Sequence, residues 1–383
     1  MRVAIIGSGC SRFGELWEKG FREIYLEAGL KAIEDAGIEG KEINALYVGN
    51  MSAGMFLGQE HVAALIADYA GLAELNIPAV RVEAADASGA VAFREAYLAI
   101  KSGLFDVVVA AGVEKVTDVS DQSKIVSSAA DQEWECFFGA NLASLYALIA
   151  KIHMKKFGGG EEDLALIAVK NHKNAVNNPI AHYRREISVE DVLSSPYVAE
   201  PLKVLDSAPI SDGAAALVLA SEEFARRVCD DPVFVEACCQ ASDYLALQSR
   251  EDLTSMKAVV KASRKAYKRA GIDSKDVDVA ELHDVFTIAE IIQYEDLGFC
   301  KKGEGYKLIR EGITCLNGDI PVNTSGGLKA CGHAAGASGI RQIAEIVDQL
   351  RGKAGKRQVD AEIGLSLSVG GTGATAVVTV LRR

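Results

Sequence analysis

The feature that most constrains the fold of this chain is an internal repeat at a spacing of 234 residues. The segment Ala36-Gly37-Ile38 recurs as Ala270-Gly271-Ile272 (270 − 36 = 234), and Ile43 and Val277 share the same offset. In both copies a helical pattern ends at a glycine, and an apolar strand follows a few residues later. The repeat therefore predicts two α/β halves of similar design. Chance similarity is the alternative, because α/β units share this pattern.

A second pair of segments marks the end of each half. Residues 212–219 and 372–379 each begin with a glycine turn and continue as an apolar strand. We therefore predict an N-terminal half at 1–224 and a C-terminal half at 225–383, with buried strands between layers of helices. The polar stretch at about 115–205 is predicted to be a loop insertion in the first half.

The charge balance narrows the classes of partner. The chain has 53 acidic and 41 basic residues, which gives a net charge of −12 at pH 7. This balance disfavours a nucleic-acid partner and gives no general attraction to anionic membranes. No apolar run approaches the roughly 18 residues that a membrane-spanning helix needs, so a cytoplasmic location is predicted.

The cysteines and the first glycine-rich segment do not predict a metal or a redox cofactor. None of the eight cysteines has C-x-x-C spacing, so the thiols are expected to be free and no metal site is predicted. The segment at 7–12 follows an apolar run, but Arg12 stands where a dinucleotide-binding turn needs its third glycine. A nicotinamide or flavin is therefore not expected.

Asp86 stands at a predicted junction between a strand and a helix. The segment 82–90 is a strand end that turns through small residues into the helical pattern of 91–97. A carboxylate at this point would lie near the helix N-terminus, where backbone N–H groups and the helix dipole favour negative charge. The alternative is that Asp86 is an ordinary N-cap.

Three further segments place polar residues or glycines in predicted loops. His283 lies where a strand gives way to a helix, and His333 lies in a glycine-rich loop that begins near Asn323. Each histidine can donate a hydrogen bond to a carbonyl or carry a proton, although a histidine taken alone is more often structural. Ser368 and Gly370 lie at the last strand end, where a glycine loop can present N–H donors to an oxyanion or form a plain hairpin turn.

In this order, the segments resemble the thiolase superfamily, especially the archaeal and sterol-carrier-protein-type thiolases. The resemblance covers essentially the whole chain. Its motifs are Phe13-Gly14-Glu15, V-E-A-A-x-A-S-G at 82–89, H-D-x-F at 283–286, G-G-L-K-A-x-G-H at 326–333 and G-G-T-G at 370–373. It implies a duplicated thiolase fold with α-β-α-β-α layers, a homodimer or dimer of dimers, and a coenzyme A thioester as substrate with no covalently bound cofactor.

The family pattern also implies roles for individual residues. His333 would activate the nucleophile and help to polarise the thioester carbonyl, and His283 would complete that oxyanion hole. The N–H groups of residue 86 and Gly370 would form a second hole, with Asn323 near the histidine loop. In this chain Asp86 stands in place of the nucleophilic cysteine.

The second cysteine that many thiolases use is absent as well. Val285 and Ser368 occupy its two usual places, and Cys331, two residues before His333, is left as a possible substitute. Attack by a carboxylate on a thioester would give a high-energy mixed anhydride. Asp86 is better suited to act as a general base that deprotonates a β-hydroxyl group, which would start a retro-aldol cleavage.

Thiolase-like steroid side-chain aldolases provide a family precedent, because they lack the cysteine and act with a zinc-ribbon and OB-fold partner protein. We therefore expect an enzyme that forms or cleaves a carbon–carbon bond beside a coenzyme A thioester. Two alternatives stay open: a non-catalytic subunit that binds acyl-coenzyme A or scaffolds a partner, and an engineered change at residue 86. Loss of the second cysteine argues against engineering alone, and retention of both histidines argues against an inactive subunit.

Overall fold

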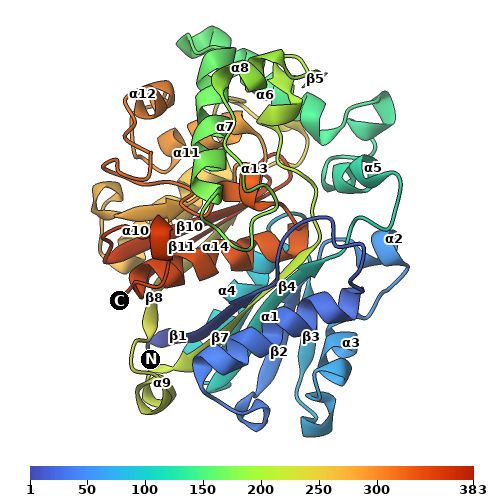
Figure 1. Ribbon diagram of the computed structural model, residues 1–383, viewed down its shortest axis with the longest axis vertical. Coiled ribbons are helices and arrows are strands. Elements are labelled where there is room, and N and C mark those ends of the chain that lie inside the picture. Colours follow the sequence, from blue (N-terminus) through green and yellow to red (C-terminus); the bar gives the residue numbers. More distant parts are fainter.

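The computed structural model describes residues 1–383 and is organised around one large sheet of nine strands (Figure 1). These strands are β1 Val3–Cys10, β2 Ala45–Gly49, β3 Ala79–Val82, β4 Val107–Glu114, β7 Gly213–Ser221, β8 Val233–Ser242, β9 Val279–Glu281, β10 Ile363–Gly370 and β11 Thr375–Arg382. A separate small sheet contains β5 Tyr197–Ala199 and β6 Leu202–Lys203. The order across the large sheet is β3-β2-β4-β7-β1-β8-β11-β10-β9.

The two halves of this sheet have the same strand order. They meet where β1 pairs antiparallel with β8, for example at Ala4 and Phe234. Outward from this contact the first half continues as β7, β4, β2 and β3, and the second half as β11, β10 and β9. A parallel bridge between Ala280 and Val322 takes the place of β3 in the second half. The duplicated fold predicted from the sequence repeat is confirmed.

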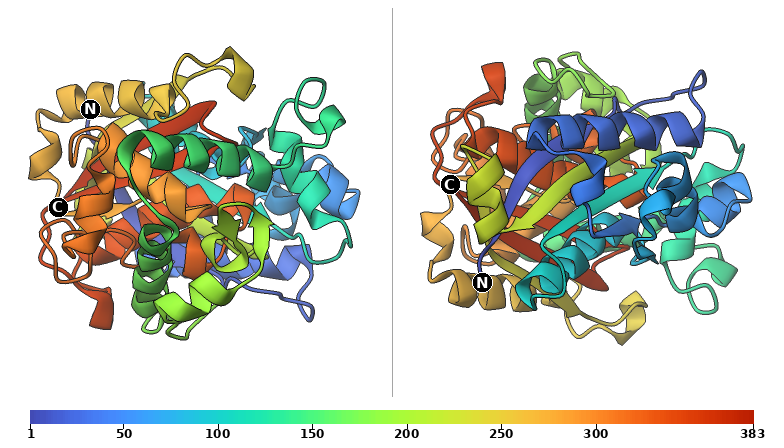
Figure 2. Two further views of the ribbon diagram at one scale, coloured as in Figure 1. Left: turned by 90° about the horizontal axis from the view of Figure 1, so that it is seen from above. Right: turned by 90° about the horizontal axis from the view of Figure 1, so that it is seen from below.

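Helices cover both faces of each half-sheet. Helix α1 (Phe21–Ala36) packs on β1 and β7, and α10 (Lys257–Ala270) packs on β8 and β11. These are the two helices that end at the repeated Ala-Gly-Ile segments. Helices α4 (Ser88–Lys101) and α14 (Ala335–Leu350) lie between the half-sheets and pack against each other. The result is the predicted α-β-α-β-α layering, which Figures 1 and 2 show from three directions.

Apolar residues of both halves share one core around the two central helices. Val108 and Leu217 come from the first half-sheet, Val377 comes from the second, and Ile340 comes from α14, and all four are buried. Burial of such surface is the main favourable term in folding. The shared core holds α4 and α14 together, and with them the loops that precede these two helices.

The glycine-rich segment near the N-terminus is part of a strand. β1 extends to Cys10, because Gly7 and Gly9 continue the antiparallel pairing with β7. A Cβ atom would lie 2.2 Å from the carbonyl oxygen of Ala32 at the first glycine, and 2.3 Å from that of Ala28 at the second. Both oxygens belong to α1, so these glycines allow α1 to pack closely on the sheet.

The segment between β4 and β7 carries the predicted insertion, drawn in green at the top of Figure 1. Its helices are α5 Gln122–Val126, α6 Leu142–Phe157, α7 Glu161–Ala175 and α8 Val189–Ser194. Helix α6 buries Tyr146 and Ile149 on one face and exposes Leu148 and Ile152 on another. The half boundary at 224/225 and the limits 115–205 stay predictions about domain organisation.

Six further helices complete the fold: α2 Ala53–Leu57, α3 Val62–Tyr69, α9 Glu222–Val228, α11 Thr287–Asp296, α12 Gly305–Arg310 and α13 Gly327–Cys331. None of the helices combines the length and the apolar character that crossing a membrane requires.

Candidate active site

Asp86 lies in a tight turn between β3 and α4. The preceding residue, Ala85, has a φ angle of +50°, a conformation that non-glycine residues rarely adopt, and it turns the chain sharply. Asp86 itself is 1% exposed. Ala87 is the N-cap of α4, and no side chain caps this helix. The alternative that Asp86 is an ordinary N-cap is therefore wrong, because its carboxylate is directed elsewhere.

The Asp86 carboxylate contacts two groups from the second half of the chain. Its Oδ1 lies 3.0 Å from Nε2 of His333, and its Oδ2 accepts a hydrogen bond of 2.9 Å from the backbone N–H of Gly371. Burial alone would raise the pKa of Asp86, but the contact with His333 and the hydrogen bond from the Gly371 N–H hold this pKa below its usual value. Asp86 is therefore an ionised carboxylate at neutral pH.

His333 occupies the turn between α13 and α14. Its Nδ1 lies 2.8 Å from the hydroxyl of Ser338, and its backbone N–H donates to the hydroxyl of Ser211. Since an ionised carboxylate only accepts hydrogen bonds, Nε2 carries the proton in its contact with Asp86. The ring is thus fixed from both sides, and its Nε2–H points at the carboxylate.

His283 follows β9 and lies next to His333. The centroids of the two rings are 5.4 Å apart and the ring planes are nearly perpendicular. Gln293 holds the backbone of His283 through two hydrogen bonds, but neither ring nitrogen of His283 has a partner. Burial, with a smaller effect of His333, lowers the pKa of His283 to about 3. A buried neutral imidazole with an unpaired N–H is a donor available to a ligand.

The remaining predicted residues lie just after the Val322 bridge and at the end of β10. Asn323 accepts a hydrogen bond from the N–H of Leu282 (2.7 Å) and donates one to Glu290 (2.7 Å), so its amide fixes the segment that carries His283. Ser368 is buried and its hydroxyl has no partner. Gly370 ends β10, and the hydrogen bond to Asp86 comes from the next residue, Gly371.

Cys331 lies in a different environment from the histidine pair. Its sulfur accepts a hydrogen bond from Asn178 and packs in an apolar cluster with Ala175 and Ala181. Burial raises its pKa to about 11, which disfavours a reactive thiolate. The structure gives no support to Cys331 as a substitute nucleophile. All eight cysteines are free, and no group of three or more His, Cys, Asp or Glu side chains is arranged to hold a metal ion.

Sequence reasoning missed three groups at this site. Gly371 supplies the N–H to Asp86, Ser338 orients His333, and the hydroxyl of Tyr146 donates to the carbonyl oxygen of Gly371 at 2.9 Å. The G-G-T-G motif is a usable signal for the first group. Tyr146 comes from α6 in the insertion, and no local pattern connects it with the C-terminal loop.

A duplicated five-layer α/β fold, with a buried polar site where the two halves meet, defines a thiolase-like protein. Two family models match the chain: "Thiolase, N-terminal domain" at residues 3–223 and "Thiolase C-terminal domain-like" at residues 239–383. The chain therefore belongs to the thiolase family.

Individual relatives agree with this assignment. The "Acetyl-CoA acetyltransferase" of Methanothermobacter thermautotrophicus is 53% identical, over 100% of this chain and 99% of the relative. The "Benzoylsuccinyl-CoA thiolase subunit BbsB" of Thauera aromatica is 36% identical, over 94% and 91%. Among solved structures, the "Ltp2-ChsH2(DUF35) aldolase" superposes with a TM-score of 0.87 at 28% identity and covers 99% of this chain and 97% of that chain.

Proposed function

We propose that this chain is an enzyme that forms or cleaves a carbon–carbon bond next to a coenzyme A thioester, and that it cleaves by a retro-aldol reaction. The observation that carries the proposal is the ionised carboxylate of Asp86, held against His333 and beside His283. Membership of the thiolase family and relatives named for acyl-coenzyme A reactions support the substrate class. The structure named as an aldolase supports the reaction class.

The proposed reaction uses a base where the family pattern has a nucleophile. Asp86 takes the proton of a β-hydroxyl group, and the O–H electron pair forms the new carbonyl. The bond between Cα and Cβ breaks, and its electrons move to the thioester as an enolate. Protonation of Cα then gives the shortened acyl-coenzyme A and a free aldehyde or ketone. The proton taken by Asp86 can return to Cα, so the enzyme ends as it began.

The histidines suit the enolate in this reaction. His283 is neutral, because its pKa is about 3, and its N–H has no partner in the protein. Such a donor stabilises the negative charge that develops on the thioester oxygen and needs no reorganisation. His333 keeps Asp86 ionised and in position through the 3.0 Å contact. Because the pKa of Asp86 is low, it is a mild base, and the reaction depends on stabilisation of the enolate.

The proposal extends to protein partners. BbsB is named as a subunit, and the Ltp2 structure is named together with ChsH2(DUF35). We infer that this chain forms a homodimer or a dimer of dimers and acts with a small zinc-ribbon and OB-fold partner.

The test is to incubate the protein with β-hydroxyacyl- and β-ketoacyl-coenzyme A, with and without the candidate partner, and to measure the carbonyl product and the acyl-coenzyme A product. Asp86→Asn should lower the rate of β-hydroxyacyl cleavage by about 10²-fold or more, because it removes the base. Glu74→Gln makes the same charge change on an exposed residue outside the site and should leave the rate unchanged. Normal thiolysis of β-ketoacyl-coenzyme A by the wild type would overturn the retro-aldol assignment.

A second candidate function is a non-catalytic subunit that binds acyl-coenzyme A. It is favoured by the engagement of Asp86, since both of its carboxylate oxygens already have protein partners and neither is left to accept a substrate proton. Saturable binding of the thioesters without turnover, in the presence of the partner, would select this function.

A further inference from the structure

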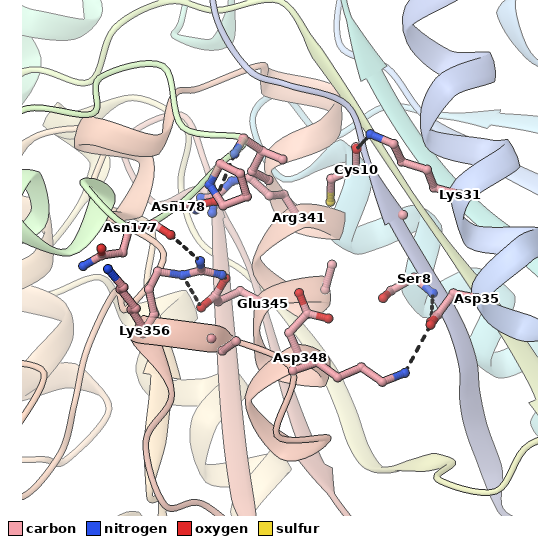
Figure 3. Close-up of a pocket in the computed structure, with 18 residues that line it drawn as sticks. Ser8, Cys10, Lys31, Asp35, Asn177, Asn178, Arg341, Glu345, Asp348 and Lys356 are labelled. Carbon is pink, nitrogen blue, oxygen red and sulfur yellow. Dashed lines mark hydrogen bonds and ion pairs between the residues drawn. The ribbon is translucent and has the colours of Figure 1, made fainter.

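A polar cavity lies outside the Asp86 site. It has a volume of about 460 Å³ and is lined by residues of α1, the end of β1, the loop at 177–180, α14 and the loop at 353–357 (Figure 3). Only four of its 18 lining residues are hydrophobic. Its volume is in the range of small-molecule sites, and its polar wall suits a charged or strongly polar ligand. Asp86, His283 and His333 are not among the lining residues.

The lining carries an excess of positive charge in a chain whose net charge is −12. Five cationic side chains face three carboxylates, a difference of two. The cations are Lys31, Arg341, Lys353, Lys356 and Arg357, and the carboxylates are Asp35, Glu345 and Asp348. Burial, and then Glu345, raise the pKa of Asp348 to about 7, so that its negative charge is incomplete near neutral pH. The lining side chains alone therefore favour anions, and Glu27 and Glu281, which pair with Lys31 and Arg341 from outside the lining, reduce this positive excess.

Most of these cations are held by carboxylates, and two are not fully paired. Arg357 is bonded to Glu345 through two nitrogens, and Lys353 is paired with Asp35. Lys356 is exposed at the rim and has no ion-pair partner. Its ammonium is free to turn toward a ligand in the cavity.

Arg341 is the second incompletely paired cation, and it forms part of the buried wall. It is 1% exposed, and its Nη1 donates to the hydroxyl of Ser325 at 2.8 Å and lies 3.7 Å from a carboxylate oxygen of Glu281. Its Nε and Nη2 have no partner in the protein. These two nitrogens form one edge of the guanidinium, which matches two oxygens of a phosphate or carboxylate. Buried unpaired donors are rare and costly, so an oxyanion bound to these two nitrogens would stabilise the folded chain.

We propose that this cavity is a second ligand site, which binds a small organic anion through a phosphate or carboxylate group. Arg341 and Lys356 supply the attraction, and the paired residues Glu345 and Arg357 keep the wall in shape. The site is independent of the reaction proposed for Asp86. It adjoins that reaction centre at three points: α14 begins two residues after His333, Asn178 donates a hydrogen bond to Cys331, and Arg341 lies 3.7 Å from Glu281, two residues before His283.

The test uses inorganic pyrophosphate as the phosphate probe and citrate as the carboxylate probe, with the full chain, in isothermal titration calorimetry at pH 7 and low salt. Saturable binding of at least one probe is expected, and the tighter probe identifies the ligand group. Lys356→Glu should weaken this binding at least tenfold. Lys101→Glu makes the same charge change at an exposed lysine on α4 outside the cavity, and it should bind like the wild type.

Two further variants make the result decisive. Arg341→Gln, with its fold checked by circular dichroism, should also weaken binding at least tenfold. Asp86→Asn should bind the probe normally, which separates this site from the proposed active site. The proposal is overturned if neither probe binds saturably, or if Lys101→Glu weakens binding as much as Lys356→Glu does.

Discussion

At the scale of single residues, the properties of Asp86 come from neighbours that lie far away in the sequence. Burial opposes its charge, whereas His333 and the N–H of Gly371 favour it, and the favourable groups prevail. Any anionic group at position 86 would gain from the same surroundings, including the start of α4 two residues later. This position is therefore suited to any anionic side chain. A carboxylate and a thiolate at this position would differ in the reaction that each can perform.

The variant Asp86→Cys tests this view of the position. We expect its thiol to have a pKa well below the usual value of about 8.5, because His333 and the α4 N-terminus stabilise the thiolate. Thiolate absorbance at 240 nm, measured against pH, gives this value. Adding His333→Ala to this variant should raise the pKa of the thiol again. A pKa at or above the usual value in Asp86→Cys would show that the surroundings of residue 86 do not favour an anion.

His283 should make stability depend on pH. Its pKa is about 3 in the folded chain and about 6.5 when unfolded, so the unfolded state binds a proton first as the pH falls. The effect of His283 on the free energy of unfolding is therefore absent above pH 6.5, and the free energy of unfolding falls as the pH drops below 6.5. Relative to His283→Asn, the wild type should lose about 2 kcal/mol of unfolding free energy between pH 7 and pH 5, measured by urea titration. Parallel pH profiles of the two proteins would contradict the assignment.

The sequence allowed the three titratable residues of the candidate site to be predicted, but not the way they contact one another. Asp86, His283 and His333 stand in recognisable motifs at strand ends, so their convergence follows from the duplicated fold. The direct bond between Asp86 and His333 depends on a positive φ angle at Ala85 and on side-chain rotamers. The contribution of Tyr146 depends on how an insertion helix packs. Neither is encoded in a local pattern.

At the scale of elements, the close approach of β4 and α14 carries a prediction. A Cβ atom on Gly112 would lie 2.1 Å from the carbonyl oxygen of Gly336 and 2.9 Å from the Cα of Ala337, and backbone atoms cannot move aside cheaply. Gly112→Ala should therefore lower the unfolding free energy by about 3 kcal/mol. Because α14 begins next to His333, it should also impair ligand binding at the Asp86 site.

Gly29→Ala is the matched control. Gly29 lies within α1, and a Cβ atom there would meet nothing within 4 Å. This substitution should raise the unfolding free energy by about 0.5 to 1 kcal/mol, because alanine favours the helix more than glycine does. Equal stability of the two variants in urea unfolding would contradict the packing argument.

The elements differ in how well the sequence predicted them. The Ala-Gly-Ile repeat located α1 and α10, since a helix that stops at glycine leaves a clear local signal. The extent of β1 was not predicted, because glycines at positions 7 and 9 suggest a turn. Their role becomes visible only when α1 is placed against them. A glycine-rich stretch of sequence can mark a loop or a close backbone contact between distant segments, and the sequence alone does not distinguish the two.

At the scale of the whole molecule, the candidate site needs residues from both halves. Asp86 is in the first half, His283 and His333 are in the second, and the insertion adds Tyr146 from a third direction. The shared core around α4 and α14 fixes the relative position of the halves. Each half therefore lacks part of the site.

The open edge of the sheet carries the last prediction, which concerns assembly. β3 pairs with β2 on one side only, and Val80 on this strand is 43% exposed. An unpaired edge strand is a template for pairing with another chain, and a twofold contact would bring Val80 close to its own copy. We expect Val80→Lys to weaken the proposed dimer roughly tenfold or more, because like charges would face each other.

Sedimentation velocity over a range of protein concentrations measures this effect. Val80→Thr keeps a β-branched side chain on the strand without adding charge, and it should assemble like the wild type. Both substitutions are at an exposed position, so the monomer fold should persist in each. A dimer that is equally stable in Val80→Lys would place the subunit contact on another face, and the exposed Leu148 and Ile152 of α6 would then be the next surface to test.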